Sequence, residues 1–127
     1  MRTTHYLLAA TVLAATACTG TARGLEAYRD DTNQLLETRR AQLATCYDDA
    51  LRTDATAAGT VTVQFVVEKT TGTISHAAVD PARSSAPAVL GQCVVHAIDG
   101  LVLAPPDRNE GRATFTYEFK PNPAPTS

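Results

Sequence analysis

The 127-residue sequence has no run of Lys or Arg and only a small excess of acidic residues. Its 11 basic and 13 acidic side chains give a formal net charge of −2, whereas nucleic-acid-binding domains carry clustered basic surfaces. Because a basic run is missing, an anionic membrane surface is not an obvious partner either. The charge distribution therefore argues against nucleic-acid binding.

Motifs of several common enzyme classes are also missing. The sequence has no G-x-S-x-G nucleophile motif, no glycine-rich phosphate loop and no Cys-x-x-Cys pair. Hydrophobic residues make up 44% of the chain and charged residues 19%, as in a globular protein of one ordinary-sized domain. The sequence therefore predicts one globular domain without a cofactor.

The chain has no apolar run long enough to cross a bilayer, which takes about 20 helical residues. Residues 6–17 form a shorter, uncharged and mostly apolar run that follows Arg2 and ends in small residues. This pattern predicts a signal peptide over residues 1–17.

Cys18 directly follows the predicted signal peptide, and two kinds of cleavage fit. Residues 15–17 suit an ordinary signal peptidase; with Cys18 they resemble a bacterial lipobox in which Ala15 replaces the usual Leu. Ordinary cleavage would leave a free thiol in an oxidising compartment, and lipidation removes that thiol. We therefore expect lipidation of Cys18 and a tether over residues 18–24. Because Thr19 rather than Asp follows, we expect an outer-membrane location; plain secretion remains the alternative.

Periodicity along the mature chain predicts five elements in the order helix, strand, strand, helix, strand. In chain order, they are a helix over 25–52, strands over 60–68 and 74–80, a helix ending near Gly100, and a strand over 112–119. A break of the first helix near Thr32 and Asn33 is an open alternative. Residues 121–127 are predicted to be a disordered tail.

The second helix is expected to begin at a cap formed by Ser84 or Ser85, with Pro87 in its first turn. Its apolar stripe is expected to comprise Val89, Cys93, Ala97 and Leu101, widened by Leu90 and Val94.

These elements predict an α+β fold, with a three-stranded antiparallel sheet and two helices on one face, in a single domain over residues 25–120. The expected core between the layers comprises Leu43, Val63, Phe65, Val94, Phe115 and Phe119.

Cys46 and Cys93 lie on the apolar stripes of the two predicted helices. With Cys18 they make an odd count of three, which in an exported protein suggests one disulfide and one cysteine with another role. If both helices cover the same sheet face, the two sulfur atoms can meet. Closing so long a loop would stabilise the fold by about 4 kcal/mol.

Four segments together resemble a known domain family: CYDDALR, GTVTVQFVVEKTTGTI, VLGQCVVHAI and APPDRNEGRATFTYEF. The family is named for the C-termini of the gliding-motility proteins AgmX and PglI, and it is similar in shape to the C-terminal domain of TonB. The resemblance covers roughly residues 43–120 and implies a TonB-C-like fold in which Cys46 and Cys93 are the paired cysteines. It does not imply an energy transducer, because the sequence shows neither a membrane-spanning helix nor a long periplasm-crossing segment.

Two groups of side chains on the helices are candidates for metal binding. Cys93, His96 and Asp99 are spaced three residues apart, and with Cys46 they would form a Cys/His site if the cysteines were thiolates. A disulfide beside an exposed His and Asp is the simpler hypothesis. The adjacent pair Asp48 and Asp49 would hold a cation only poorly, because neighbouring side chains point apart on a helix.

His76 is a candidate general base, with Ser75 or Asp80 nearby. Because the sequence marks no nucleophile, a solvent-facing histidine is the simpler hypothesis.

The leading functional hypothesis is a non-enzymatic envelope lipoprotein whose disulfide-stapled domain binds another envelope protein. A strand edge can accept a partner strand through main-chain hydrogen bonds, and segments 113–119 and 73–79 are the candidate edges. Alternatively, Lys120, Pro121 or Pro81 blunts these edges. A thiol or metal protein and a histidine-dependent enzyme remain alternative functions.

Overall fold

The computed structural model describes residues 21–121, so the predicted signal peptide, Cys18 and most of the predicted tail lie outside the described residues. The elements are α1 (Leu25–Glu37), α2 (Arg40–Thr53), β1 (Gly59–Val67), β2 (Ile74–Val79), the 3₁₀ turn η1 (Pro81–Arg83), α3 (Ala88–Ile98) and β3 (Gly111–Phe119).

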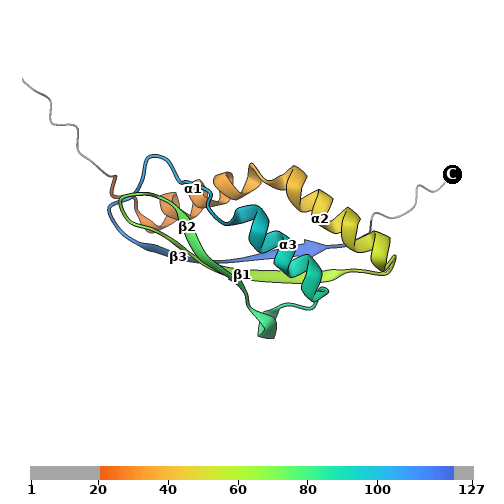
Figure 1. The fold of residues 1–127 in the computed structure, drawn as a ribbon. Coiled ribbons are helices and arrows are strands. Elements are labelled where there is room, and N and C mark those ends of the chain that lie inside the picture. Colours follow the sequence, from red (N-terminus) through yellow and green to blue (C-terminus); the bar gives the residue numbers. More distant parts are fainter. Residues whose placement is uncertain (1–20, 122–127) are drawn as a thin grey trace, which may run out of the picture.

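The three strands form one antiparallel sheet in the order β2-β1-β3, and the α-helices lie over one of its faces (Figure 1). The α+β class and the three-stranded sheet are therefore as predicted. β1 is central because it pairs with β2 on one edge and with β3 on the other. It buries a continuous apolar side against the helices, and this side comprises Val61, Val63, Phe65 and Val67.

The first predicted helix is two helices, and the predicted break near Thr32 and Asn33 is wrong. Thr32 is buried within α1, and its hydroxyl donates to the Tyr28 carbonyl 2.7 Å away, so the helix continues through it. The break falls at Thr38 and Arg39. There the backbone forms tighter i to i−3 bonds, and the Thr38 hydroxyl also bonds to the Leu35 carbonyl, which ends the α-helical ladder. Three α-helices rather than two therefore cover the sheet.

The start of α3 also differs from the prediction. Pro87 is the N-cap residue, and neither Ser84 nor Ser85 caps the helix. Their hydroxyls instead accept hydrogen bonds of 2.9 Å from the backbone N–H groups of Thr62 and Thr60 in β1. The two serines thus give hydrogen-bond partners to backbone N–H groups in the part of β1 that extends beyond its pairing with β2.

The buried stripe of α3 is rotated relative to the predicted one. Val89 is 78% exposed, whereas the buried residues of the helix are Leu90, Gly91, Val94 and Ile98. Gly91 faces Val79 of β2, so the absence of a side chain allows close approach of helix and sheet. Cys93 and Ala97 lie at the half-buried border of this stripe.

The core joins all the main elements. Leu36 of α1, Leu43 and Cys46 of α2 and the α3 stripe pack against the apolar side of β1. Phe115 and Phe119 of β3, which were predicted to lie in the core, are half-buried at its border. They lie there because β3 is an outer strand, with no further strand beyond it to complete its cover.

Candidate functional site

A disulfide joins Cys46 of α2 to Cys93 of α3, with an S–S distance of 2.04 Å. Both sulfur atoms are therefore part of a covalent bond between α2 and α3, and neither is present as a thiolate. His96 and Asp99, the other members of the candidate metal site, are exposed. No group of three or more potential metal-binding side chains gathers anywhere within residues 21–121.

The other polar candidates lie at the surface. His76 is exposed on the sheet face opposite the helices, with Nδ1 3.1 Å from the Ser75 hydroxyl. Asp80 instead accepts from the Ala82 N–H and so caps η1. Asp48 and Asp49 are both exposed, and Asp49 pairs with Arg52. These side chains do not converge on a common site.

The two candidate sheet edges differ in how far they are covered. The outer side of β2 is already occupied at its start, where Ile74 exchanges hydrogen bonds with Gly100 and Leu101. A bulge interrupts the pairing of β2 with β1, and His76 in it has a positive φ of 54°. Both features hinder the addition of another strand to β2.

β3 offers a longer and regular free edge. It pairs with β1 without a bulge from Gly111 to Phe119. The backbone groups of Thr60 and Thr62 point toward the β2 side of the sheet, where they bond to Ser85, Ser84 and Asp80. The odd-numbered residues of β1 therefore bond to β3, because bonding directions alternate along a strand.

The same alternation settles which groups of β3 face outward. Val61 pairs with Tyr117 and Val63 with Phe115, so the odd-numbered residues of β3 bond to β1. The N–H and C=O groups of Arg112, Thr114, Thr116 and Glu118 consequently point away from the sheet. No other backbone group of the described chain bonds to these four residues.

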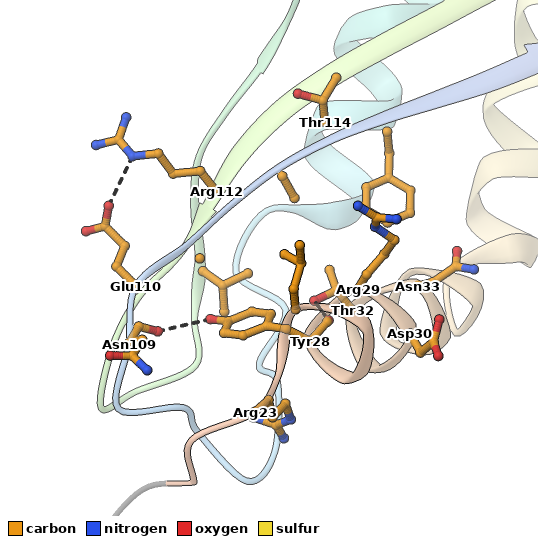
Figure 2. A pocket seen from close by; sticks show the side chains of 15 residues that line it. Arg23, Tyr28, Arg29, Asp30, Thr32, Asn33, Asn109, Glu110, Arg112 and Thr114 are labelled. Atoms are coloured by element: carbon orange, nitrogen blue, oxygen red, sulfur yellow. Dashed lines mark hydrogen bonds and ion pairs between the residues drawn. The ribbon is translucent and has the colours of Figure 1, made fainter.

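Two grooves lie beside this edge on the helix side. The larger, with a volume of about 660 Å³, lies between α1 and residues 111–115 of β3. Figure 2 shows Tyr28 reaching from α1 to the carbonyl of Asn109 at one end of this groove, 3.2 Å away. The smaller groove, of about 320 Å³, lies between the α1–α2 junction and Tyr117 to Phe119.

No family model, no curated protein and no solved structure matches the chain. The family resemblance therefore stays a prediction. None of the helices within residues 21–121 is both long and apolar enough to span a membrane.

Sequence reasoning missed a buried polar cluster at the start of the folded chain. Asp107 is fully buried and accepts hydrogen bonds of 2.8 Å from the backbone N–H groups of Arg23 and Asn109. The side chain of Arg23 is also buried, and its Nε pairs with the carboxylate of Asp31 at 2.6 Å. Burial alone raises the pKa of Asp107, but the two N–H donors and the Arg23 charge outweigh it and hold that pKa below its usual value.

This cluster fixes residues 21–24, which the sequence predicted as part of a tether, to the domain. A lone Asp in a proline-containing loop is too common a pattern to predict such a role. Only the fold brings Asp107 to Arg23, which lies 84 residues earlier in the chain.

Proposed function

We propose that the protein is a non-enzymatic lipoprotein of the bacterial envelope that binds an extended segment of another envelope protein along the β3 edge. The free main-chain groups of Arg112, Thr114, Thr116 and Glu118 carry this proposal, because a partner strand would satisfy all of them at once.

The surroundings of the edge support strand addition. The helix-facing side chains of β3 are only half-buried, and Phe115 and Phe119 are the largest apolar ones among them. An added strand would cover these rings, and its own helix-facing side chains would enter the two grooves. Lys120 and Pro121 follow the last strand residue, so they can blunt only the far end of the edge.

The lipid anchor is the second part of the proposal. It rests on the apolar run 6–17 and on Cys18 behind it, which predict acylation and an outer-membrane location. Acylation would also leave Cys46 and Cys93 as the only cysteines for a disulfide, which is the pairing in the fold.

The third part of the proposal concerns the family to which the fold is related. We propose that the domain is TonB-C-like and related to the AgmX and PglI C-terminal family. The antiparallel sheet order β2-β1-β3 and the cysteine pair support this assignment. The extra helix α1 lies outside the resembling segment, which begins near residue 43.

The edge is tested by removing its outward N–H groups. Thr114→Pro and Thr116→Pro each delete one outward donor, while the ladder to β1 keeps all of its donors. A photo-crosslinking residue in place of Glu118 reports the neighbour of the edge in living cells. We expect a specific adduct that is lost in both proline variants.

Matched controls separate the main chain from the side chain. Thr114→Val and Thr116→Val keep the N–H groups, and both are expected to retain the adduct. A crosslinking residue in place of the exposed Gln92 of α3 is expected not to form this adduct. An adduct that survives both proline variants in folded protein would overturn strand addition at β3.

The anchor is tested separately by the intact mass of protein extracted from membranes. We expect a chain that begins at Cys18 and is heavier by its acyl groups. An unmodified chain would contradict the anchor while leaving the edge proposal to its own test.

A further inference from the structure

The first described residues are held at one fixed point of the domain. The Thr21 N–H donates to the Pro106 carbonyl at 3.1 Å, and the Arg108 N–H donates to the Thr21 carbonyl at 2.9 Å. The Arg23 guanidinium adds a 2.7 Å bond to the Pro105 carbonyl, and its backbone N–H bonds to buried Asp107. The chain that precedes Thr21 therefore has a defined point of attachment.

The length of chain before that point sets a short reach. Only Thr19 and Gly20 lie between Cys18 and Thr21. Three peptide units span at most about 11 Å even when they are fully extended. If Cys18 carries the acyl chains, the surface around Thr21 cannot move far from the headgroups.

We propose that the end of the domain formed by residues 21–25, 69–71 and 105–108 lies against the headgroup surface of the bilayer. We call it the anchored end. The proposal rests on the lipidation of Cys18 proposed above and adds a fixed orientation to it.

The chemistry of the anchored end suits a headgroup surface. The Thr70 N–H bonds to the Asp107 carbonyl, which places the neighbouring Lys69 and Arg108 at the same end. Both side chains are exposed, and neither forms an ion pair with another side chain of residues 21–121. Leu25, 76% exposed, follows the attached segment directly and offers an apolar contact at the interface.

The opposite end of the molecule has a different character. Figure 1 shows that the start of the described chain and the turn between β1 and β2 lie at one end, whereas β3 and α2 finish at the other. The exposed residues near the finish of α2 include Asp48, Asp54 and the ion pair between Asp49 and Arg52. Anionic headgroups would therefore attract Lys69 and Arg108 of the anchored end, which form no ion pair within the described residues, more strongly than this end.

The orientation has a consequence for the β3 edge. β3 starts at Gly111, close to the anchored end, and runs toward the opposite end (Figure 1). Its edge would then point sideways and extend away from the membrane, so a partner strand could reach all of it.

The orientation is tested on the acylated full-length protein in vesicles of phosphatidylethanolamine and phosphatidylglycerol. A fluorophore is attached to Thr71→Cys at the anchored end or to Asp48→Cys at the opposite end, and nitroxide-labelled headgroups act as quencher. We expect quenching at residue 71 to be at least about threefold stronger than at residue 48, because three peptide units hold Thr21 of the anchored end within about 11 Å of Cys18.

A spacer variant provides the control. Inserting a Gly/Ser segment of about 12 residues between Thr19 and Gly20 lengthens the reach by about 20 Å without touching the fold. We expect the difference between the two positions to shrink at least about twofold, because a longer flexible tether relaxes the constraint. Comparable quenching at both positions in the parent protein would overturn the proposal.

The two cations have their own test. Lys69→Gln with Arg108→Gln should reduce quenching at residue 71 when phosphatidylglycerol is present, whereas Arg40→Gln with Arg52→Gln should not. Unchanged quenching in the first pair would overturn the headgroup contact of Lys69 and Arg108. Intact mass distinguishes the failures, since acylated protein without preferred orientation contradicts only this inference and unacylated protein contradicts the anchor.

Discussion

The backbone N–H of Arg23 donates a 2.8 Å hydrogen bond to the buried carboxylate of Asp107, across 84 residues of sequence. The same carboxylate accepts from the Asn109 N–H, so it holds both the start of the chain and the loop before β3. This one side chain therefore attaches the N-terminal segment to the domain.

We expect Asp107→Ala to lower the free energy of unfolding by about 1–3 kcal/mol, because it leaves buried N–H donors without an acceptor. Urea unfolding followed by circular dichroism measures the loss. Asp31→Ala is the matched control, since that carboxylate pairs with the same Arg23 but is 43% exposed, and we expect its loss to stay below about 1 kcal/mol. Equal losses would contradict the special role of Asp107.

Asp107 should also affect how the free energy of unfolding falls at acid pH. Its pKa is held below the usual value in the folded protein, so its contribution is present at neutral pH. That contribution is lost as pH falls below the unfolded value of about 3.9 and through the folded pKa. Unfolding measured at several pH values should therefore show a shallower acid loss in Asp107→Asn than in the parent. A parallel loss in both proteins would contradict the assignment.

Removal of the disulfide between Cys46 and Cys93 should lower the free energy of unfolding. Cys46 and Cys93 are 47 residues apart. A disulfide that closes a loop of this length lowers the entropy of the unfolded chain, and on the chain-entropy model this stabilises the folded state by about 4 kcal/mol. We expect Cys46→Ser with Cys93→Ser to lower unfolding stability by roughly that amount. Unfolding of the parent protein with reductant checks the result without a substitution. A change below about 1 kcal/mol would show that the disulfide adds little stability.

Two glycines with similar backbone angles should respond differently to alanine. Gly72 and Gly100 have φ values of 73° and 79°, so alanine at either costs about 1–2 kcal/mol for the left-handed conformation. A Cβ at residue 72 would in addition overlap the Leu103 carbonyl, whereas one at residue 100 meets no heavy atom within 4 Å. We expect Gly72→Ala to cost at least about 2 kcal/mol more than Gly100→Ala in urea unfolding. Equal costs would contradict the close approach at Leu103.

The Tyr117 hydroxyl is buried and has no hydrogen-bond partner within residues 21–121. Tyr117→Phe should therefore leave stability unchanged or raise it by up to about 1 kcal/mol. Burial, with a smaller effect of the Glu37 charge, raises the pKa of Tyr117 to about 12. The folded protein thus loses stability as pH rises from about 10 toward 12, and the variant should lose less. Ultraviolet titration of the phenolate follows this ionisation, and a normal value near 10 in the folded protein would contradict the burial.

Local spacing in the sequence was a reliable guide to the elements and to the faces of the strands. The alternation of Val61, Val63, Phe65 and Val67 predicted the buried side of β1, since successive side chains of a strand must point to opposite faces. The helix ends were less predictable. Thr38 and Arg39 carry no strong breaking signal, and the serines expected to cap α3 serve β1 instead.

The sequence by itself determined an α+β chain with apolar stripes, two cysteines on those stripes and an apolar N-terminal run before Cys18. The tertiary structure shows the expected disulfide between Cys46 and Cys93, which the sequence had left conditional on both helices covering one sheet face. It alone decided that β3 rather than β2 keeps a free edge and that Arg23 docks on Asp107. The reason is physical. Periodicity fixes which side of an element is apolar, whereas bonds between distant residues depend on which segments the packed layers bring together.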